Sequence, residues 1–215
     1  MAILFANREW SVRDEGYLAK GPGPNYWSKE NVWLDDSGKL HLAVRWNPLY
    51  ACWECAQVKL TDSLGYGTYR WKVEGFPSRM DEQLILGLYT YDQFAIDADY
   101  REIDIEIGKW GDPDNQNSQY VIRPSNPNGG YKSRFNTTQT GSYMMYEYTW
   151  QPGFLHFKTW HGHDSTKKPF HEWTFEGDFV PQPGNETTQM NLWLFRGESP
   201  RQNHEVIIKD FHFIK

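Results

Sequence analysis

The chain of 215 residues is longer than an average domain but within the usual range of a single all-β sandwich. Its formal net charge of −6 at pH 7 and the lack of any run rich in lysine and arginine argue against nucleic acid or an anionic membrane as a partner. No stretch of about 18 apolar residues predicts a transmembrane helix, and no basic segment followed by an apolar one predicts a signal peptide.

Short strand patterns separated by turn residues run through the chain from residue 39 onward. Few segments show helical periodicity over a useful length. The run at 84–91 is apolar almost throughout, which is typical of a strand covered on both faces. The predicted strands are residues 40–45, 68–73, 84–91, 102–107, 119–123, 143–150, 154–160, 171–175, 190–195 and 205–214.

Loops rich in proline, glycine and asparagine are predicted at residues 21–25, 112–115 and 124–130. Strand patterns continue on both sides, so we interpret these segments as rim loops and not as linkers. The sequence shows no internal repeat and no domain boundary. These features predict a single all-β domain over residues 1–215, built as a sandwich of two antiparallel sheets.

Aromatic side chains are abundant in an otherwise polar sequence. They make up 17% of the residues, while the mean hydropathy is −0.77. One interpretation is a sandwich whose surplus rings face a ligand, because exposed rings can stack on the apolar faces of sugars. The alternative is that the rings simply fill the core.

The segment REIDIEI at residues 101–107 alternates acidic and apolar side chains. Successive side chains of a β-strand point to opposite faces, so Glu102, Asp104 and Glu106 share one face and the isoleucines share the other. A helix turns by about 100° per residue and would gather neither set into a stripe. The pattern therefore predicts a strand with one face in the core and a row of acids on the other.

Three acids on one strand face are compatible with catalysis. The Cα atoms of Glu102 and Glu106 are expected about 13 Å apart. Leaning side chains then allow both the carboxyl spacing of roughly 5–5.5 Å typical of a retaining glycosidase and the roughly 6.5–9.5 Å typical of an inverting one. Asp104 between them can share a proton, because three close carboxyls do not all ionise readily. The alternative is a solvated or cation-binding strand face.

Two further segments contain metal-ligating residue types. Cys52 and Cys55 lie three residues apart with no second pair to complete a zinc site, which favours two ordinary thiols over a strained disulfide or a reactive pair. The segment 161–164, HGHD, lies between two strand patterns and is interpreted as a hairpin loop, with a metal site as the alternative.

The segment 102–106, EIDIE, resembles the catalytic signature of glycoside hydrolase family 16, the laminarinase and lichenase group. The resemblance implies a concanavalin A-like β-jelly roll with a glycan cleft across its concave sheet. It also implies a glycoside hydrolase that acts on a polysaccharide. Further similarities to the family, in the family's order, lie at residues 31–33, 38–42, 65–69, 148–153, 190–193 and 210–211.

By this resemblance Glu102 would be the nucleophile, Glu106 the general acid/base and Asp104 the acid that tunes them, in a retaining double displacement. The regular spacing between Asp104 and Glu106 is similar to that of lichenases and xyloglucan-active members. The xyloglucan transglycosylases usually add a cysteine-bearing C-terminal extension, which this chain lacks. The leading interpretation is an endo-β-glucanase that cuts mixed-linkage β-1,3-1,4-glucan or β-1,3-glucan. The alternatives are a non-catalytic glycan-binding sandwich and a transglycosylase on a related polysaccharide.

The resemblance also implies residues that contact the glycan. Tyr100 stands where lichenases have a tryptophan, and Val121 stands where they have an asparagine, so the departures concern the substrate and not the chemistry. For Trp193 the alternative is a core position. The candidate substrate-binding residues are Asn31, Tyr100, Trp110, Asn191 and Trp193.

No cofactor is expected for catalysis, but the resemblance implies a structural calcium ion on the convex face. Asp210 and the Gly38 carbonyl occupy positions similar to its ligands, and oxygen ligands of this kind suit calcium. The alternative is that Asp210 is an ordinary strand-end residue. We further expect a monomer that is the mature form of a secreted or periplasmic protein, and a cytoplasmic location stays open.

Overall fold

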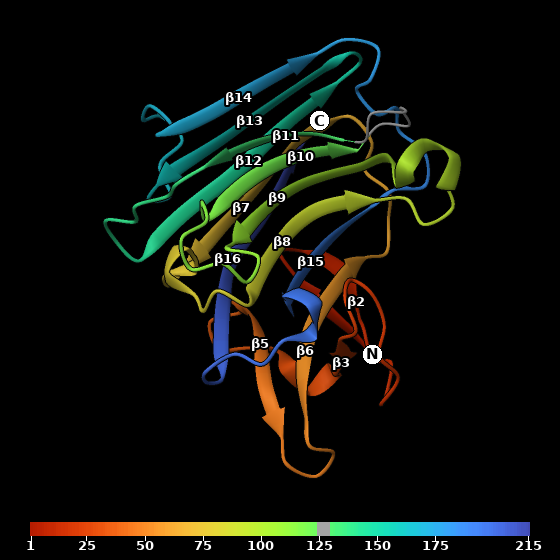
Figure 1. Cartoon of the computed structure of the whole chain (residues 1–215). Helices are drawn as coiled ribbons and strands as arrows, with labels where there is room; N and C mark the ends of the chain where they lie inside the picture. Colours follow the sequence, from red (N-terminus) through yellow and green to blue (C-terminus); the bar gives the residue numbers. More distant parts are fainter. Residues whose placement is uncertain (124–129) are drawn as a thin grey trace.

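The computed structural model describes residues 1–123 and 130–215, and these residues form a β-sandwich (Figure 1). The strands are β1 (Ala2–Phe5), β2 (Arg8–Val12), β3 (Tyr26–Trp27), β4 (Val32–Leu34), β5 (Leu40–Asn47), β6 (Cys52–Leu60), β7 (Gly67–Glu74), β8 (Leu84–Tyr91), β9 (Glu102–Gly108), β10 (Ser118–Arg123), β11 (Tyr131–Phe135), β12 (Tyr143–Gln151), β13 (Phe154–His161), β14 (His171–Glu176), β15 (Thr187–Leu194) and β16 (His204–Ile214). The 3-10 helices are η1 (Lys29–Asn31), η2 (Pro77–Arg79), η3 (Ile96–Arg101) and η4 (Phe195–Gly197).

Two layers make up the sandwich, and one hairpin joins them. The hydrogen-bonded order is β11-β10-β9-β8-β15-β6-β5-β16-β7-β12-β13-β14. We call the layer from β11 to β6, extended by β2 and β1, the cleft sheet, and the layer from β5 to β14 the back sheet (Figure 1). The β5–β6 hairpin carries the chain between them, because one part of β5 pairs with β6 and another part pairs with β16. All neighbours in this order are antiparallel, as predicted.

The core lies between the two layers and follows the alternation of the sequence. Ile103, Ile105 and Ile107 of β9 are buried in it, as the REIDIEI pattern predicts. Burial of such apolar side chains contributes roughly 1.5–3 kcal/mol each. Many rings also fill the core, and the largest fully buried ones are Trp10, Trp27, Trp71, Trp150, Tyr69, Tyr120, Tyr146 and Tyr148.

Every predicted strand is present, but the alternation rule missed several others. It found neither β1 to β4 nor β6 and β11, because these strands are short or carry polar residues at alternate positions. Residues 84–90 of β8 are buried on both faces, as predicted, and only Tyr91 is half-buried. One face of β8 packs on the core, but Gly87, Tyr89 and Tyr91 on the other face line a cleft.

The remaining local predictions concern loops and cysteines. Residues 21–25 and 112–115 lie in turns between strands, whereas the loop predicted at 124–130 falls almost wholly outside the described residues. Both cysteines are free thiols, and burial raises the pKa of Cys55 to about 12. β13 ends at His161 of HGHD, and the chain bends at the next two residues. Within residues 1–123 and 130–215 no His, Cys, Asp or Glu side chains gather in a group that could hold a metal, and no helix is long and apolar enough to span a membrane.

Candidate active site

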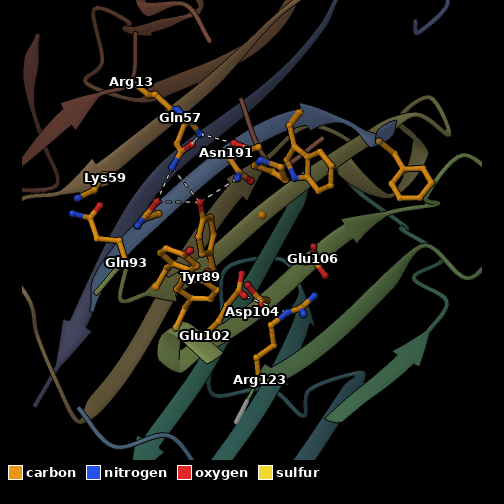
Figure 2. A pocket seen from close by; sticks show the side chains of 18 of the residues that line it. Arg13, Gln57, Lys59, Tyr89, Gln93, Glu102, Asp104, Glu106, Arg123 and Asn191 are labelled. Atoms are coloured by element: carbon orange, nitrogen blue, oxygen red, sulfur yellow. Dashed lines mark hydrogen bonds and ion pairs between the residues drawn. The ribbon is translucent and has the colours of Figure 1, made fainter. Parts of the chain in front are cut away.

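A cleft of about 900 Å³ crosses the face of the cleft sheet that points away from the core (Figure 2). Its floor is made of alternate residues from neighbouring strands, because side chains two apart on a strand share a face. β9 contributes Glu102, Asp104 and Glu106 to this floor. The other main lining residues are Gln57 and Lys59 of β6, Gly87, Tyr89 and Tyr91 of β8, Gln119 and Arg123 of β10, and Gln189, Asn191 and Trp193 of β15.

The register of the sheet decides which side chain stands beside each acid. On β10, Arg123 pairs with Glu102, Val121 with Asp104 and Gln119 with Glu106. On β8, Tyr89 pairs with Asp104 and Gly87 with Glu106. Directly paired side chains lie about 4.5–5.5 Å apart at Cβ, so each acid has a fixed neighbour on both sides.

Each glutamate has its own polar partner. Arg123 Nε lies 3.2 Å from Glu102 Oε2 and forms an ion pair with it. Asp104 forms a side-chain hydrogen bond with Glu102. Gln119 Nε2 donates a hydrogen bond of 2.5 Å to Glu106 Oε2, and Arg134 Nε donates one of 2.8 Å to Gln119 Oε1. Glu102 and Glu106 are thus held by contacts from β10, and Arg134 of β11 supports the one made by Gln119.

Burial raises the pKa of all three acids. It raises the pKa of Glu102 to about 7, against the opposing charge of Arg123. It raises the pKa of Asp104 well above its ordinary value, and the charges of Glu102 and Glu106 add to the effect. The pKa of Glu106 is also raised by burial, while the hydrogen bond from Gln119 opposes this rise. The acid row therefore holds protons near neutral pH, which general-acid chemistry requires.

The raised pKa of Asp104 has a measurable effect on stability. An aspartate whose pKa is higher in the folded chain binds a proton more tightly there, so stability is lost as the pH rises above the ordinary value. We expect Asp104→Asn to raise the thermal midpoint at pH 8 and to have less effect at pH 4. The rise should be about 3–5 °C for each pH unit by which folding raises this pKa. Calorimetry across this pH range measures it.

Asp164→Asn is the matched control for this experiment. A side-chain hydrogen bond from Thr166 lowers the pKa of the exposed Asp164, so its carboxylate contributes stability above the ordinary pKa. This variant should lower the midpoint slightly at pH 8 or leave it unchanged. An Asp104→Asn midpoint that follows the wild type at every pH would contradict the assignment of a raised pKa to Asp104.

Tyr100 reaches the cleft from an unusual turn. Asp99, Tyr100 and Arg101 have φ of 47°, 60° and 53°, which is the left-handed region that costs about 1–2 kcal/mol per residue. Backbone hydrogen bonds of 2.8 Å from Tyr100 N to Ala95 O and from Asp92 N to Tyr100 O hold the turn. The Tyr100 ring stacks on Tyr91 with centroids 4.9 Å apart. The turn therefore places the Tyr100 ring against Tyr91 of β8, two residues before Glu102 in the chain.

Asn191 lies on the cleft floor, as the sequence predicts, and one of its polar atoms has no partner. Its Nδ2 donates to Tyr89 Oη at 3.2 Å, but its buried Oδ1 accepts no hydrogen bond within the part of the chain that the structure describes. Gln57 and Gln189 complete the network around the same tyrosine hydroxyl (Figure 2). Asn191 Oδ1 is thus a buried acceptor at the cleft floor that has no hydrogen-bond partner among the described residues.

Trp110 and Trp193 also line the cleft. Arg134 lies over the Trp110 ring, with its guanidinium carbon 4.6 Å from the ring centroid. Trp193 is half-buried. It lines the cleft and also packs against the core, so both the cleft position and the core position considered for this residue describe part of its surroundings.

Asn31 is a correction, because the structure places it outside the cleft. It is the last residue of η1, its side chain is only 2% exposed, and its Nδ2 donates to Glu54 O at 2.8 Å. The buried amide is satisfied by this backbone carbonyl, so its role is to hold η1 against β6.

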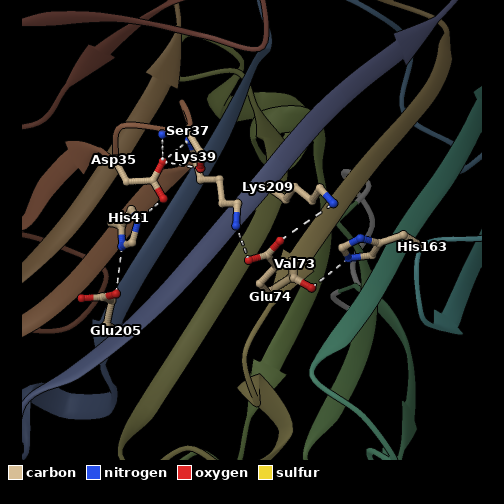
Figure 3. A network of polar contacts seen from close by, with 9 residues as sticks. All are labelled: Asp35, Ser37, Lys39, His41, Val73, Glu74, His163, Glu205 and Lys209. Atoms are coloured by element: carbon tan, nitrogen blue, oxygen red, sulfur yellow. Dashed lines mark hydrogen bonds and ion pairs between the residues drawn. The ribbon is translucent and has the colours of Figure 1, made fainter.

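The two residues implied in calcium binding lie on the back sheet side of the molecule, away from the acids. Lys72 Nζ lies 3.6 Å from Asp210 Oδ2, and Gly38 N donates to Asp35 O. Figure 3 shows Asp35 of the same turn, whose side chain accepts hydrogen bonds from Ser37. One carboxylate that is already beside an ammonium group does not fit calcium, which takes six to eight oxygen ligands. The calcium hypothesis stays a prediction without support from this donor set.

The sequence pattern does not single out several residues that line the cleft. Arg123, Arg134 and Gln119 gave no signal of their own, because isolated polar residues on strands are usually solvated. Once β9 and β10 are paired, their alternation alone places Gln119 and Arg123 on the acid face. Gly87 and Tyr89 lie in the apolar run of β8, where the sequence does not distinguish cleft residues from core residues.

Comparisons with known proteins support the fold. No protein-family model matches the sequence, and no curated protein matches it either. The β-glucanase of Bacillus licheniformis is 20% identical with a TM-score of 0.72, and the match covers 96% of this chain and 92% of that chain. A family 16 endo-glucanase from Bacteroides ovatus is 14% identical with a TM-score of 0.67, covering 95% and 94%.

A third similar structure is described as a pseudo β-1,3-glucanase of Mycobacterium tuberculosis. It is 17% identical with a TM-score of 0.65, and the match covers 93% of this chain and 88% of that chain. Likeness at these identities concerns the backbone arrangement over nearly the whole of each chain. The chain therefore has the β-jelly-roll fold of the family 16 β-glucanases.

Proposed function

We propose that the protein is a retaining endo-β-glycosidase that hydrolyses β-glucan, either mixed-linkage β-1,3-1,4-glucan or β-1,3-glucan. The observation that carries the proposal is the pair Glu102 and Glu106, half-buried on either side of the buried Asp104 on the floor of an open cleft. Two carboxyls of raised pKa and unequal environment are what glycoside hydrolysis requires. The glucanase names of the similar structures support β-glucan as the substrate class.

The lining of the cleft suits a neutral sugar chain. Tyr91, Tyr100, Trp110 and Trp193 provide ring faces that can stack on the apolar faces of sugar rings. Side-chain amides stand between them, and Asn191 Oδ1 is an acceptor without a partner in the described residues. Apolar surfaces with a few placed polar groups are typical of ligand sites.

In the first step Glu102 attacks the anomeric carbon while Glu106 protonates the glycosidic oxygen. The bond between the anomeric carbon and the leaving oxygen breaks, a bond to Glu102 forms, and the leaving sugar departs with the proton of Glu106. The product is a covalent glycosyl-enzyme with inverted configuration. Ionised Glu102 disfavours a second charge nearby, so it helps to keep the proton on Glu106.

In the second step water displaces Glu102 from the anomeric carbon. Esterification of Glu102 removes its negative charge, so the pKa of Glu106 falls and its carboxylate can accept a proton from water. The water oxygen bonds to the anomeric carbon, the ester bond to Glu102 breaks, and the proton returns to Glu106. Two inversions give net retention of configuration.

Product analysis on a panel of polysaccharides tests the proposal. The panel holds mixed-linkage β-glucan, β-1,3-glucan, xyloglucan and galactans, and proton NMR follows the anomer formed first. We expect cleavage of one of the first two, early products of many lengths, and the β-anomer before mutarotation. Net inversion would exclude Glu102 as nucleophile, cleavage of only the other polymers would exclude β-glucan, and elongated products would identify a transglycosylase.

A non-catalytic glycan-binding protein is the second candidate. The ion pair of Arg123 with Glu102 favours it, because a guanidinium already occupies the carboxylate that would attack. The neighbour described as a pseudo β-1,3-glucanase supports it as well. Calorimetric binding of a polymer of the panel without any release of reducing ends would select this candidate.

A further inference from the structure

The two glutamates have unequal contacts with arginine. Arg123 touches Glu102 directly, with Nε 3.2 Å from Oε2. Arg134 reaches Glu106 only through the neutral amide of Gln119, by hydrogen bonds of 2.8 Å and 2.5 Å. Figure 2 shows Arg123 extending from β10 toward the acid row.

Arg134 is held firmly at its end of this relay. Its guanidinium lies over the Trp110 ring, and its Nη1 donates to Asn115 Oδ1 at 3.0 Å. The cation fixes the orientation of the Gln119 amide, because its Nε donates to Gln119 Oε1 and so leaves Nε2 to point at Glu106. Since Gln119 donates to Oε2 of Glu106, a proton on this carboxyl is left to Oε1.

We propose that Arg123 and Arg134 are positioning residues whose unequal contacts assign the glutamates different roles. Arg123 favours the ionised form of Glu102, whereas Arg134 orients Glu106 through Gln119 and leaves one of its two oxygens free to carry a proton. The roles in catalysis rest on the proposed function, but the charge assignment is a property of the protein alone and is measurable without substrate.

The surroundings of Glu102 support this assignment. Arg123 is the only cation that pairs with Glu102 among the described residues, and every other ionisable group that faces it is acidic. A half-buried carboxylate among acids would take up a proton readily, so the ionised form of Glu102 depends on the one guanidinium. The facing groups are Asp104 and Glu106 of β9, Asp99 and Tyr100 of η3, and Tyr89 and Tyr91 of β8.

The same arginine also serves the second step of the reaction. When Glu102 is esterified, Arg123 loses the counter-ion that it had in the free protein. Its charge also acts on Glu106, where it favours the carboxylate over the carboxylic acid. The guanidinium then stabilises the ionised Glu106 that must accept a proton from water.

Carbon-13 NMR of protein labelled at the glutamate side-chain carboxyl tests the charge assignment directly. Glu102→Gln and Glu106→Gln identify the two signals by their loss. We expect Arg123→Gln to raise the titration midpoint of Glu102 by about one pH unit or more. Arg134→Gln should raise the midpoint of Glu106 by less, because its charge acts through an amide. Arg123→Lys should restore part of the wild-type midpoint of Glu102, and it also serves if the glutamine variant folds poorly.

Lys132→Gln is the matched control, because it removes one positive charge from an exposed position on β11 that forms no ion pair with either glutamate within residues 1–123 and 130–215. It should leave both midpoints within experimental error of the wild type. A Glu102 midpoint that Arg123→Gln leaves unchanged would overturn the proposal. If Arg134→Gln changes the midpoint of Glu106 more than Arg123→Gln changes the midpoint of Glu102, the proposed inequality of the two contacts is wrong.

The pH profile of kcat/KM separates this proposal from the proposed function. Arg123→Gln should move the acid limb to higher pH and, because its charge also acts on Glu106, the basic limb as well, whereas Arg134→Gln should move only the basic limb. A limb that moves by one pH unit changes kcat/KM on its slope about tenfold, which is a loss on the acid side and a gain on the basic side. Midpoints that move in a protein that cleaves no glycan would leave the charge assignment standing and remove the glycosidase. Cleavage of a glycan together with unchanged midpoints of Glu102 and Glu106 would support the glycosidase and overturn the charge assignment.

Discussion

Glu102→Gln is expected to lower kcat/KM on the cleaved β-glucan by roughly 10⁴-fold or more. Glutamine is nearly isosteric with glutamate but cannot form the glycosyl ester, so the first step loses its nucleophile while the cleft keeps its shape. The change also removes a charge that burial disfavours, so the variant should fold. Initial rates of reducing-end release and circular dichroism measure the two effects.

Azide distinguishes the roles of the two glutamates. In Glu102→Ala, azide can enter the vacated space and attack the anomeric carbon directly, which gives an α-glycosyl azide from a β-linked substrate. In Glu106→Ala, azide attacks the glycosyl-enzyme in place of water and gives a β-glycosyl azide. An activated aryl glycoside is the substrate, because it departs without protonation.

Two outcomes would contradict the assignment of these roles. A Glu102→Gln variant with wild-type rates would show that Glu102 is not the nucleophile, provided that mass spectrometry confirms the substitution. A β-glycosyl azide from Glu102→Ala and an α-glycosyl azide from Glu106→Ala would exchange the roles. Glu147→Gln is unsuitable as a control because Glu147 pairs with Arg70 in a buried site, whereas the exposed Glu176→Gln should leave the rate unchanged.

Gly87→Ala has the second largest expected effect, because Gly87 stands between Glu106 and Asn191 on the cleft floor. A Cβ at this position would overlap Asn191 Oδ1. The Asn191 side chain would have to rotate and give up its hydrogen bond of 3.2 Å to Tyr89 Oη. We expect KM to rise about tenfold, the equivalent of about 1.4 kcal/mol and of roughly one hydrogen bond.

Stability must be followed in the same experiment, because overpacking costs typically about 1–3 kcal/mol. Gly141→Ala is the matched control, since nothing lies within 4 Å of the Cβ that it would add. If Gly87→Ala and Gly141→Ala have the same KM as the wild type, Asn191 does not contact the substrate. Loss of kcat with unchanged KM in Gly87→Ala would instead indicate that the added methyl group disturbs Glu106.

The local sequence pattern was sufficient to predict β9, the strand that carries the three acids. Alternation in β9 requires only that side chains two apart share a face, and the isoleucines decide which face meets the core. The same rule found each strand with a regular apolar period. It failed for β6 and β11, where the residues on the cleft face are polar and those strands are held by their neighbours.

The resemblance to family 16 supplied residue types but not their surroundings. It placed Tyr100, Trp110, Asn191 and Trp193 correctly beside the cleft. Asn31 closes a 3-10 turn that packs against β6, so its amide is used inside the fold. No property of residue 31 itself distinguishes a carbonyl of Glu54 from a sugar hydroxyl as its partner.

The sequence by itself determined the row of three acids, their common face and the apolar anchor beneath them, because these depend on a period of two within seven residues. Only the tertiary structure decided which side chain stands beside each acid. Arg123, Gln119 and Gly87 come from strands whose register with β9 is set by pairing between residues 13 to 21 positions apart in the sequence and by the packing of the whole sheet. The unequal environment of Glu102 and Glu106, on which their chemistry depends, is therefore a property of the register.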